Sequence, residues 1–232
     1  FFVAEKNKIS VDEFIERLHQ IDDTYPFQNL YVLQNLLSSH DTERLSSLIQ
    51  NPDRKYEHDA NEGNKNYKPG KPTGDDIEKQ KLVAAFQLLY RGAPMIYYGD
   101  EVGMWGADDP HDRKPMVWDD LVYENEIINE QSGFKTGFGN YTVEQNKNLL
   151  EFYKTIIKIR NGNEPLKTGT IKFIYSDNEK KTFAFESVIE DQKTVCAFNL
   201  GLSEVSIPLD YEVVELFSSN TEINSNIKSI AS

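Results

Sequence analysis

A histidine and an aspartate stand side by side where an apolar run of the sequence ends. Residues 31–37 predict a fully buried strand, and small and polar residues follow it up to His40 and Asp41. At the carboxyl end of a parallel strand, such a pair can hydrogen-bond the hydroxyl groups of a sugar or shape a carboxylate site. A second interpretation is a loop turn in which Asp41 caps a helix that begins at Thr42. The pair by itself leaves both interpretations open.

A later segment, residues 108–118, carries further side chains that suit a polar ligand. It combines Asp109 with Arg113. An arginine offers several fixed donors, and a carboxylate accepts hydrogen bonds from neighbouring hydroxyls. The alternative is a salt bridge between Arg113 and an aspartate of the same loop, and the two roles can coexist. Trp105 is a candidate platform for a sugar ring, whereas Trp118 is expected to pack against the protein.

Three other polar residues near these segments are expected to serve the structure. Residues 95–98 predict a second buried strand, and Asp100 and Glu101 follow it directly. We expect their carboxylates to fix the loop by hydrogen bonds and not to react. Arg44, which follows the histidine–aspartate pair, is expected to be structural as well.

Three blocks of this sequence, taken together, resemble glycoside hydrolase family 13, the α-amylase family. The first, L-Q-N-L-L-S-S-H-D-T-E-R at 33–44, is similar to the end of that family's barrel strand seven. The second, G-A-P-M-I-Y-Y-G-D-E-V-G-M at 92–104, resembles strand eight and its exit. The third, D-D-P-H-D-R-K-P-M-V-W at 108–118, resembles the loop after strand eight in the cyclomaltodextrinase and neopullulanase branch. The blocks occur in the family's order, and the resemblance covers nearly the whole chain.

The resemblance implies a fold and a set of roles. The fold class is α/β: the C-terminal part of a (β/α)8 barrel, with strands seven and eight and their helices, followed by a small antiparallel β-sandwich. Asp41 matches the family's transition-state stabiliser, which binds the 2- and 3-hydroxyls of the glucose at the cleaved bond, and His40 matches the histidine that shares this task. Asp109 and Arg113 match a pair that binds the next sugar on the non-reducing side.

The two reacting carboxyl groups of the family are expected outside this chain. Retaining glycosidases use a nucleophile and an acid/base about 5–5.5 Å apart. In the family these are an Asp after strand four and a Glu after strand five, and both would lie upstream of Phe1; the chain contains no G-x-R-x-D pattern. The resemblance therefore implies part of a retaining α-glucan hydrolase acting on α-1,4 or α-1,6 bonds, inactive as this chain alone. A glucanotransferase, a non-catalytic amylase-like protein and a glucan-binding module are the alternatives.

The composition and net charge limit the classes of molecule that this chain is expected to bind. The chain has 232 residues, 38% of them hydrophobic, and a formal net charge of −13. This charge disfavours nucleic acid and anionic membrane surfaces but not a neutral α-glucan oligosaccharide or polysaccharide. No apolar run is long enough to cross a membrane. Exposed barrel edges allow pairing into a homo-oligomer. The sequence begins without a Met, so it does not decide between a secreted, periplasmic or cytoplasmic location.

No cofactor is expected, and no metal site is assigned. The single Cys196 excludes an intrachain disulfide and a zinc cluster, and we expect it to be buried and inert. Calcium occurs in some members of the family, but its usual sites lie largely upstream of this chain. Asp108 and Asp109 alone are too weak a cluster to bind it.

The resemblance implies a C-terminal part of the (β/α)8 catalytic barrel at 1–163 and a C-terminal all-β domain at 164–232, and the sequence pattern changes to short strands after this boundary. Ser10 and Glu13 suggest a capping box at the start of the first helix, and Thr142 is the expected cap of the last long one. A polar loop is expected at 51–76, which either forms one side of a substrate cleft or is exposed to solvent without a role in binding. Helices are expected at 10–21, 42–49, 75–91 and 142–160, and strands at 170–175, 182–188, 193–199, 203–208 and 212–217.

Overall fold

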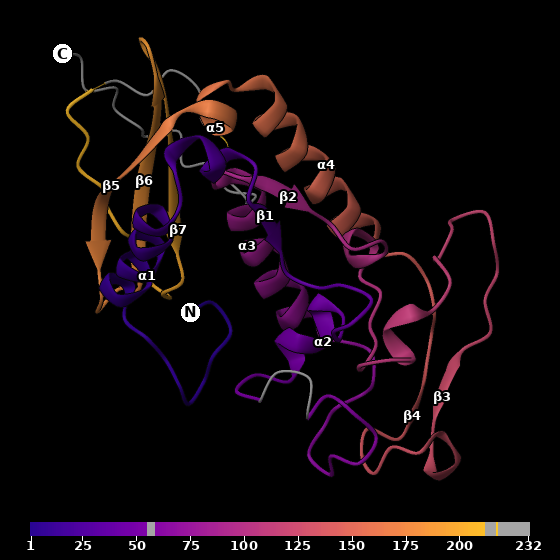
Figure 1. Ribbon diagram of the computed structural model, residues 1–232. Coiled ribbons are helices and arrows are strands. Elements are labelled where there is room, and N and C mark those ends of the chain that lie inside the picture. The colour runs from indigo at the N-terminus through magenta and orange to yellow at the C-terminus, as the bar shows by residue number, and fades with distance from the viewer. Residues whose placement is uncertain (55–58, 212–216, 218–232) are drawn as a thin grey trace.

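The computed structural model describes residues 1–54, 59–211 and 217 (Figure 1). Among these residues, no helix is both long enough and apolar enough to span a bilayer. The helices are α1 Val11–Thr24, α2 Leu45–Gln50, α3 Gly74–Leu89, α4 Lys147–Gly162 and α5 Pro165–Thr168, and the 3-10 helices are η1 Phe27–Tyr31, η2 Asp100–Val102, η3 His111–Arg113 and η4 Glu130–Ser132. The strands are β1 Gln34–Leu36, β2 Ala93–Met95, β3 Glu126–Ile128, β4 Gly139–Tyr141, β5 Thr170–Asp177, β6 Thr182–Ile189 and β7 Gln192–Asn199.

Two parallel strands, β1 and β2, form the part of the fold from which the candidate site emerges. They pair side by side in the centre of the molecule, between α3 and α4 (Figure 1). The side chain of Gln87 on α3 joins them, because its Nε2 donates to the carbonyl oxygens of Asn35 at 2.7 Å and of Met95 at 2.8 Å. The α/β arrangement expected for neighbouring barrel strands is present in this pair.

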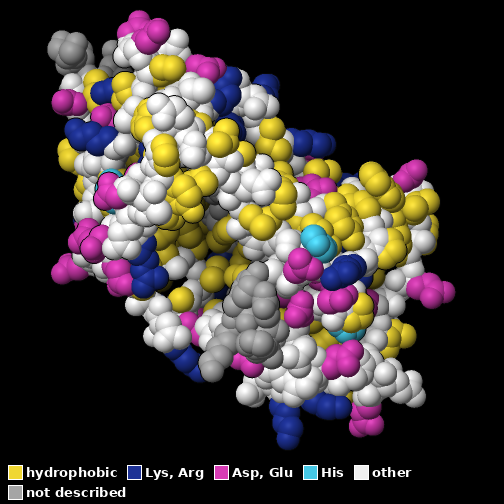
Figure 2. Space-filling model, viewed as in Figure 1, with side chains coloured by type: hydrophobic (Ala, Val, Ile, Leu, Met, Phe, Trp, Pro, Cys, Tyr) yellow, Lys and Arg dark blue, Asp and Glu magenta, His cyan; other side chains and the backbone are white. Residues whose placement is uncertain are grey.

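Both strands are shorter than predicted, and they are not fully buried. Tyr31 lies in η1, and β2 begins two residues before the predicted range 95–98 and ends at its first residue, Met95. The side chains of Gln34 and Leu36 point to solvent, with Leu36 45% exposed. The physical reason is that, within the described part of the chain, β1 has β2 as its only strand neighbour. An apolar cavity between α1, β1 and α3 opens at the same place, and Figure 2 shows a hollow on this face of the molecule.

The helices follow the predicted periodicity, but α1 lacks the predicted capping box and α4 starts later than expected. The Ser10 side chain caps α1 by accepting from the Glu13 backbone N–H at 3.0 Å, while the Glu13 side chain pairs with Arg17 instead of completing the capping box. Helix α4 begins five residues later than the expected cap at Thr142. Asn146 caps it, accepting from a helix N–H at 3.0 Å.

The described residues 51–54 and 59–73 of the long loop 51–73 pack against the segment between β2 and α4. Its Ala60 and Tyr67 join Ala107, Ile128 and Phe134 in one apolar cluster. Tyr67 is 1% exposed, so the interpretation of this loop as merely exposed to solvent is wrong. The segment 99–146 also contains the antiparallel pair β3–β4, which was not predicted. Figure 1 shows this pair extending away from the helices.

A three-stranded antiparallel sheet, β5–β6–β7, follows α5, as predicted for the first three strands of the C-terminal region. Phe183 on β6 packs against Val11 of α1 and Phe86 of α3 in one core. The expected sandwich is not seen among the described residues, because 203–208 forms no strand. The predicted strand 212–217 falls outside the described residues apart from its last position, and the division at residue 163 stays a prediction.

Arg160 of α4 fastens the end of α3 to the start of β2. It is 8% exposed and donates to the carbonyl oxygens of Leu88 at 2.8 Å, Tyr90 at 3.0 Å and Gly92 at 2.7 Å. Arg160→Ala leaves these carbonyls without their charged donor, and we expect a loss of about 2–4 kcal/mol in unfolding free energy.

Chemical denaturation of the chain measures this loss. The matched control is Lys158→Ala on the exposed side of the same helix, which is expected to change stability by less than about 0.5 kcal/mol. Equal effects of the two substitutions would contradict the structural role of Arg160.

Candidate functional site

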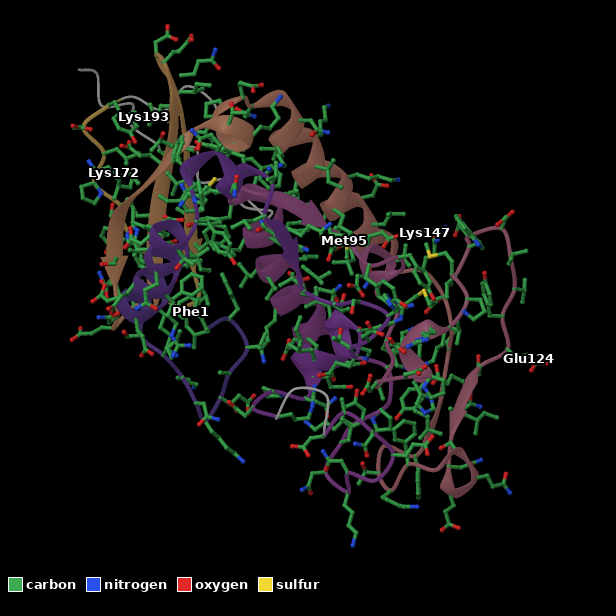
Figure 3. All side chains as sticks on the ribbon, in the orientation of Figure 1. Phe1, Met95, Glu124, Lys147, Lys172 and Lys193 are labelled. Atoms are coloured by element: carbon green, nitrogen blue, oxygen red, sulfur yellow. The ribbon has the colours of Figure 1, made fainter. Side chains whose placement is uncertain are left out.

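The structure brings four of the predicted site residues together. His40 and Asp41 follow β1, whereas Asp109 and Arg113 come from the segment after β2. Figure 3 labels Met95 at the end of β2, and the segment extends from there toward Glu124. Two stretches about seventy residues apart in the sequence thus meet at the carboxyl ends of two adjacent parallel strands, where barrel active sites form.

Arg113 is the centre of this cluster. Its Nε donates to the backbone oxygen of His40 at 2.9 Å and lies 3.1 Å from Oδ1 of Asp109. Its Nη2 lies 3.5 Å from Oδ1 of Asp41. The predicted salt bridge within the loop is therefore present, and the same arginine also contacts the histidine–aspartate pair.

The cluster is open to solvent. The side chains of His40 and Asp41 are 67% and 68% exposed, and their Nε2 and Oδ2 atoms are 3.3 Å apart. Arg113 is 46% exposed. Exposed ion pairs stabilise a protein by only about 0–1 kcal/mol. Hydrogen bonds to the hydroxyl groups of a ligand can therefore replace these ion pairs with little loss of free energy. Figure 2 shows acidic, basic and histidine side chains gathered on this face, beside apolar surface.

The interpretation of Asp41 as a helix cap is wrong. Helix α2 begins at Leu45, after Arg44 in an extended conformation, and no side chain caps it. The expected helix start at Thr42 is occupied by a turn in which the Thr42 hydroxyl accepts from the Ser39 N–H at 3.0 Å. The carboxylate of Asp41 is therefore left to face solvent and Arg113.

Arg44, Asp100 and Glu101 have the structural roles predicted for them. Arg44 is fully buried, donates to the carbonyl of Tyr98 at 2.6 Å, and lies 4.8 Å from the ring centroids of both Tyr97 and Tyr98. Glu101 accepts from a backbone N–H of the turn after β2 at 2.8 Å. Asp100 is buried next to Arg44. These contacts tie the segment after β1 to the turn after β2.

The two tryptophans differ in burial from what the sequence led us to expect. Trp105 is only 5% exposed, and the Nζ atoms of Lys71 and Lys114 lie 5.8 Å and 5.4 Å from its ring centroid. It does not offer the sugar platform predicted for it, because long side chains cover the ring. Trp118, expected to pack, is 56% exposed.

The loop 51–73 supports the segment that carries Asp109. The carbonyl of Ala60 accepts from the Asp108 N–H at 2.8 Å. The side chain of Glu62 lies 2.9 Å from Nε2 of His111, and the His111 ring lies 4.8 Å from that of Phe134. No local sequence pattern marks Glu62 as the partner of His111.

No group of three or more His, Cys, Asp or Glu side chains within the described ranges is placed to hold a metal ion. Cys196 is buried on β7, and burial raises the pKa of its thiol to about 12, as expected for an inert cysteine. His58 lies outside the described residues.

Known proteins resemble this chain in both sequence and structure. The family model of the alpha amylase catalytic domain matches residues 3–169. A cyclomaltodextrinase of Geobacillus thermopakistaniensis is 30% identical over 207 residues, which are 88% of this chain and 27% of that protein. Neopullulanase 2 of Thermoactinomyces vulgaris is 30% identical over 192 residues, 83% of this chain and 25% of that protein.

A solved cyclomaltodextrinase structure superimposes on the chain with a TM-score of 0.59 at 29% identity, covering 86% of this chain and 26% of that one. The chain thus spans about a quarter of the length of these relatives. Since the catalytic-domain match runs through β1, β2 and all four clustered residues, the chain belongs to the α-amylase family, glycoside hydrolase family 13.

Proposed function

We propose that this chain is part of a retaining α-glucan hydrolase that cleaves α-1,4 or α-1,6 bonds. The observation that carries the proposal is the convergence of His40, Asp41 and Asp109 on Arg113 at the ends of two parallel barrel strands. Homologues named cyclomaltodextrinase, neopullulanase and amylopullulanase support an α-glucan as the substrate.

In this proposal Asp41 and His40 bind vicinal hydroxyls of the glucose at the cleaved bond. An ionised carboxylate accepts two hydroxyl hydrogen bonds, and a neutral imidazole both donates and accepts. These bonds strengthen as the ring flattens toward an oxocarbenium-like transition state, so they accelerate the reaction as well as bind substrate. Asp41 transfers no proton and forms no covalent bond.

Asp109 and Arg113 bind the neighbouring sugar. Arg113 already contacts the backbone of His40 and the carboxylates of Asp41 and Asp109, so a sugar hydroxyl at this point meets donors and acceptors together. In this proposal the sugar that the pair binds is not the one whose ring flattens, so its contacts are expected to change little during bond cleavage. This pair therefore contributes to binding rather than to the chemical step.

The 232-residue chain alone is expected to show no hydrolysis of maltoheptaose or cyclodextrin. Retaining hydrolysis needs two carboxyl groups about 5–5.5 Å apart, and the role assigned to Asp41 supplies neither of them. A reducing-sugar assay measures this. Turnover by the chain that persists in Asp41→Ala would contradict the proposal, and hydrolysis by the longer protein that carries these residues would support it.

A further inference from the structure

The segment 38–44, which carries the histidine–aspartate pair, is fastened at both ends to the turn after β2. At its start, the hydroxyl of Ser38 donates a hydrogen bond to Oδ2 of Asp100. At its end, Arg44 donates to the carbonyl of Tyr98 and lies 3.8 Å from Oδ1 of Asp100. Both ends of the segment therefore meet one carboxylate.

The three side chains that make this connection are buried. Asp100 is 2% exposed, Ser38 3% and Arg44 0%. Gln80 of α3 holds Asp100 from the helix layer by donating to its backbone oxygen at 2.8 Å. Burial raises the pKa of Asp100 to about 7, and Ser38 and Arg44 act in the opposite direction. A hydrogen bond to a buried carboxylate is strong, and its loss lowers the stability of the fold.

Between its ends the segment forms a local turn and is also contacted by other parts of the chain: Arg113 donates to the backbone oxygen of His40 at 2.9 Å, and the Tyr67 hydroxyl donates to Oε2 of Glu43 at 3.2 Å. The Ser39 N–H donates to the Thr42 hydroxyl at 3.0 Å, and the Asp41 N–H donates to the Ser39 hydroxyl at 3.1 Å. This turn sets the shape of the segment but not its place in the molecule. The contact of Arg113 with Asp41 is exposed to solvent and therefore weak, so the position of the His40 and Asp41 side chains depends mainly on the buried ends of the segment.

We propose that Asp100 is a positioning residue for His40 and Asp41, holding both ends of the segment 38–44 so that the pair faces the sugar. The inference rests on the function proposed above for the pair. Asp100 itself touches no sugar. Displacement of a binding group by about 1 Å can cost on the order of a hundredfold in rate.

Activity of the longer protein tests the proposal first. Ser38→Ala and Asp100→Asn are expected to lower kcat on maltoheptaose about ten- to a hundredfold, with a smaller change in KM. Ser38→Thr keeps the hydroxyl and restores most of the rate. Glu151→Gln, on the exposed face of α4, leaves it unchanged. Adding Ser38→Ala to Asp41→Asn causes a smaller further loss than Ser38→Ala causes in the unmodified protein, because Ser38 acts partly through Asp41.

A second readout does not depend on catalysis. Nitrogen-15 relaxation of the 232-residue chain is expected to show increased backbone mobility at His40 and Asp41 in Ser38→Ala but not in Glu151→Gln. Unchanged mobility, or losses that multiply with those of Asp41→Asn, would overturn the positioning role. Absence of glucan turnover in the unmodified longer protein would overturn the proposed function instead, and relaxation would still decide whether Asp100 holds the segment.

Discussion

Arg44→Ala is expected to lower the unfolding free energy of the chain by about 3–5 kcal/mol, because it leaves a buried carboxylate without its cation. Arg44 is fully buried, and its guanidinium lies against Asp100, the Tyr98 carbonyl and the rings of Tyr97 and Tyr98. Alanine removes the charge, the hydrogen bond and the ring contacts together. Urea denaturation of the chain measures the loss.

The pH dependence of this loss separates the charge from the packing. Burial already raises the pKa of Asp100 to about 7, and removal of Arg44 raises it further. A raised carboxyl pKa means that the folded state binds more protons than the unfolded state. Stability therefore falls as pH rises through this range, and the variant should lose more at pH 8 than at pH 5.

Two further variants serve as controls for the loss of stability in Arg44→Ala. Arg44→Lys keeps the charge and should recover part of the stability, without the planar fork. Arg17→Ala removes an exposed arginine whose partner is Glu13 on the same helix, and should cost less than about 1 kcal/mol. A loss at Arg44 no larger than at Arg17, or one independent of pH, would show that the buried pair does not hold the segment.

The four clustered candidate site residues could be singled out from the sequence because each lies in a short block that resembles the α-amylase family. His40 and Asp41 end an apolar run, and Asp109 and Arg113 are close together in one loop. What joins the two blocks is Arg113, whose contacts with both were not predicted in detail. Such contacts depend on the parallel pairing of β1 and β2, which a local pattern does not encode.

Burial of single side chains was harder to predict than the elements that carry them. Trp105 and Trp118 are similar in local sequence context, yet Lys71 and Lys114 cover one of them and nothing comparable covers the other among the described contacts. Lys71 belongs to the loop 51–73, whose packing depends on contacts far apart in the sequence. For the same reason the pairing of Glu62 with His111 was missed.

Helix starts show where local chemistry is ambiguous. Thr142 and Asn146 are both good capping residues, and local sequence does not rank them. The structure selects Asn146, whose backbone N–H also donates to the carbonyl of Val102 at 2.9 Å. The strands β5, β6 and β7 were predicted closely because alternation and turn residues are local signals, and their pairing is between neighbours in the sequence.

Asp41→Asn is expected to produce the largest functional effect of any single substitution in the described cluster. Asparagine has nearly the same shape as aspartate but carries no charge, so the two hydroxyl bonds of the proposed site weaken most in the transition state. We expect kcat of the longer protein on maltoheptaose to fall about a thousandfold, with KM changed little. A loss confined to KM would mean that Asp41 only binds the ground state.

The turnover number of Asp41→Asn, compared with that of a matched control, tests whether Asp41 stabilises the transition state. Asp119→Asn removes an equally exposed carboxylate, 62% exposed and 2.8 Å from Lys147, and should leave kcat unchanged. We expect the unmodified longer protein and Asp119→Asn to hydrolyse the glucan at the same rate, and Asp41→Asn to have a kcat about a thousandfold lower. Hydrolysis at the same rate in all three would contradict this expectation.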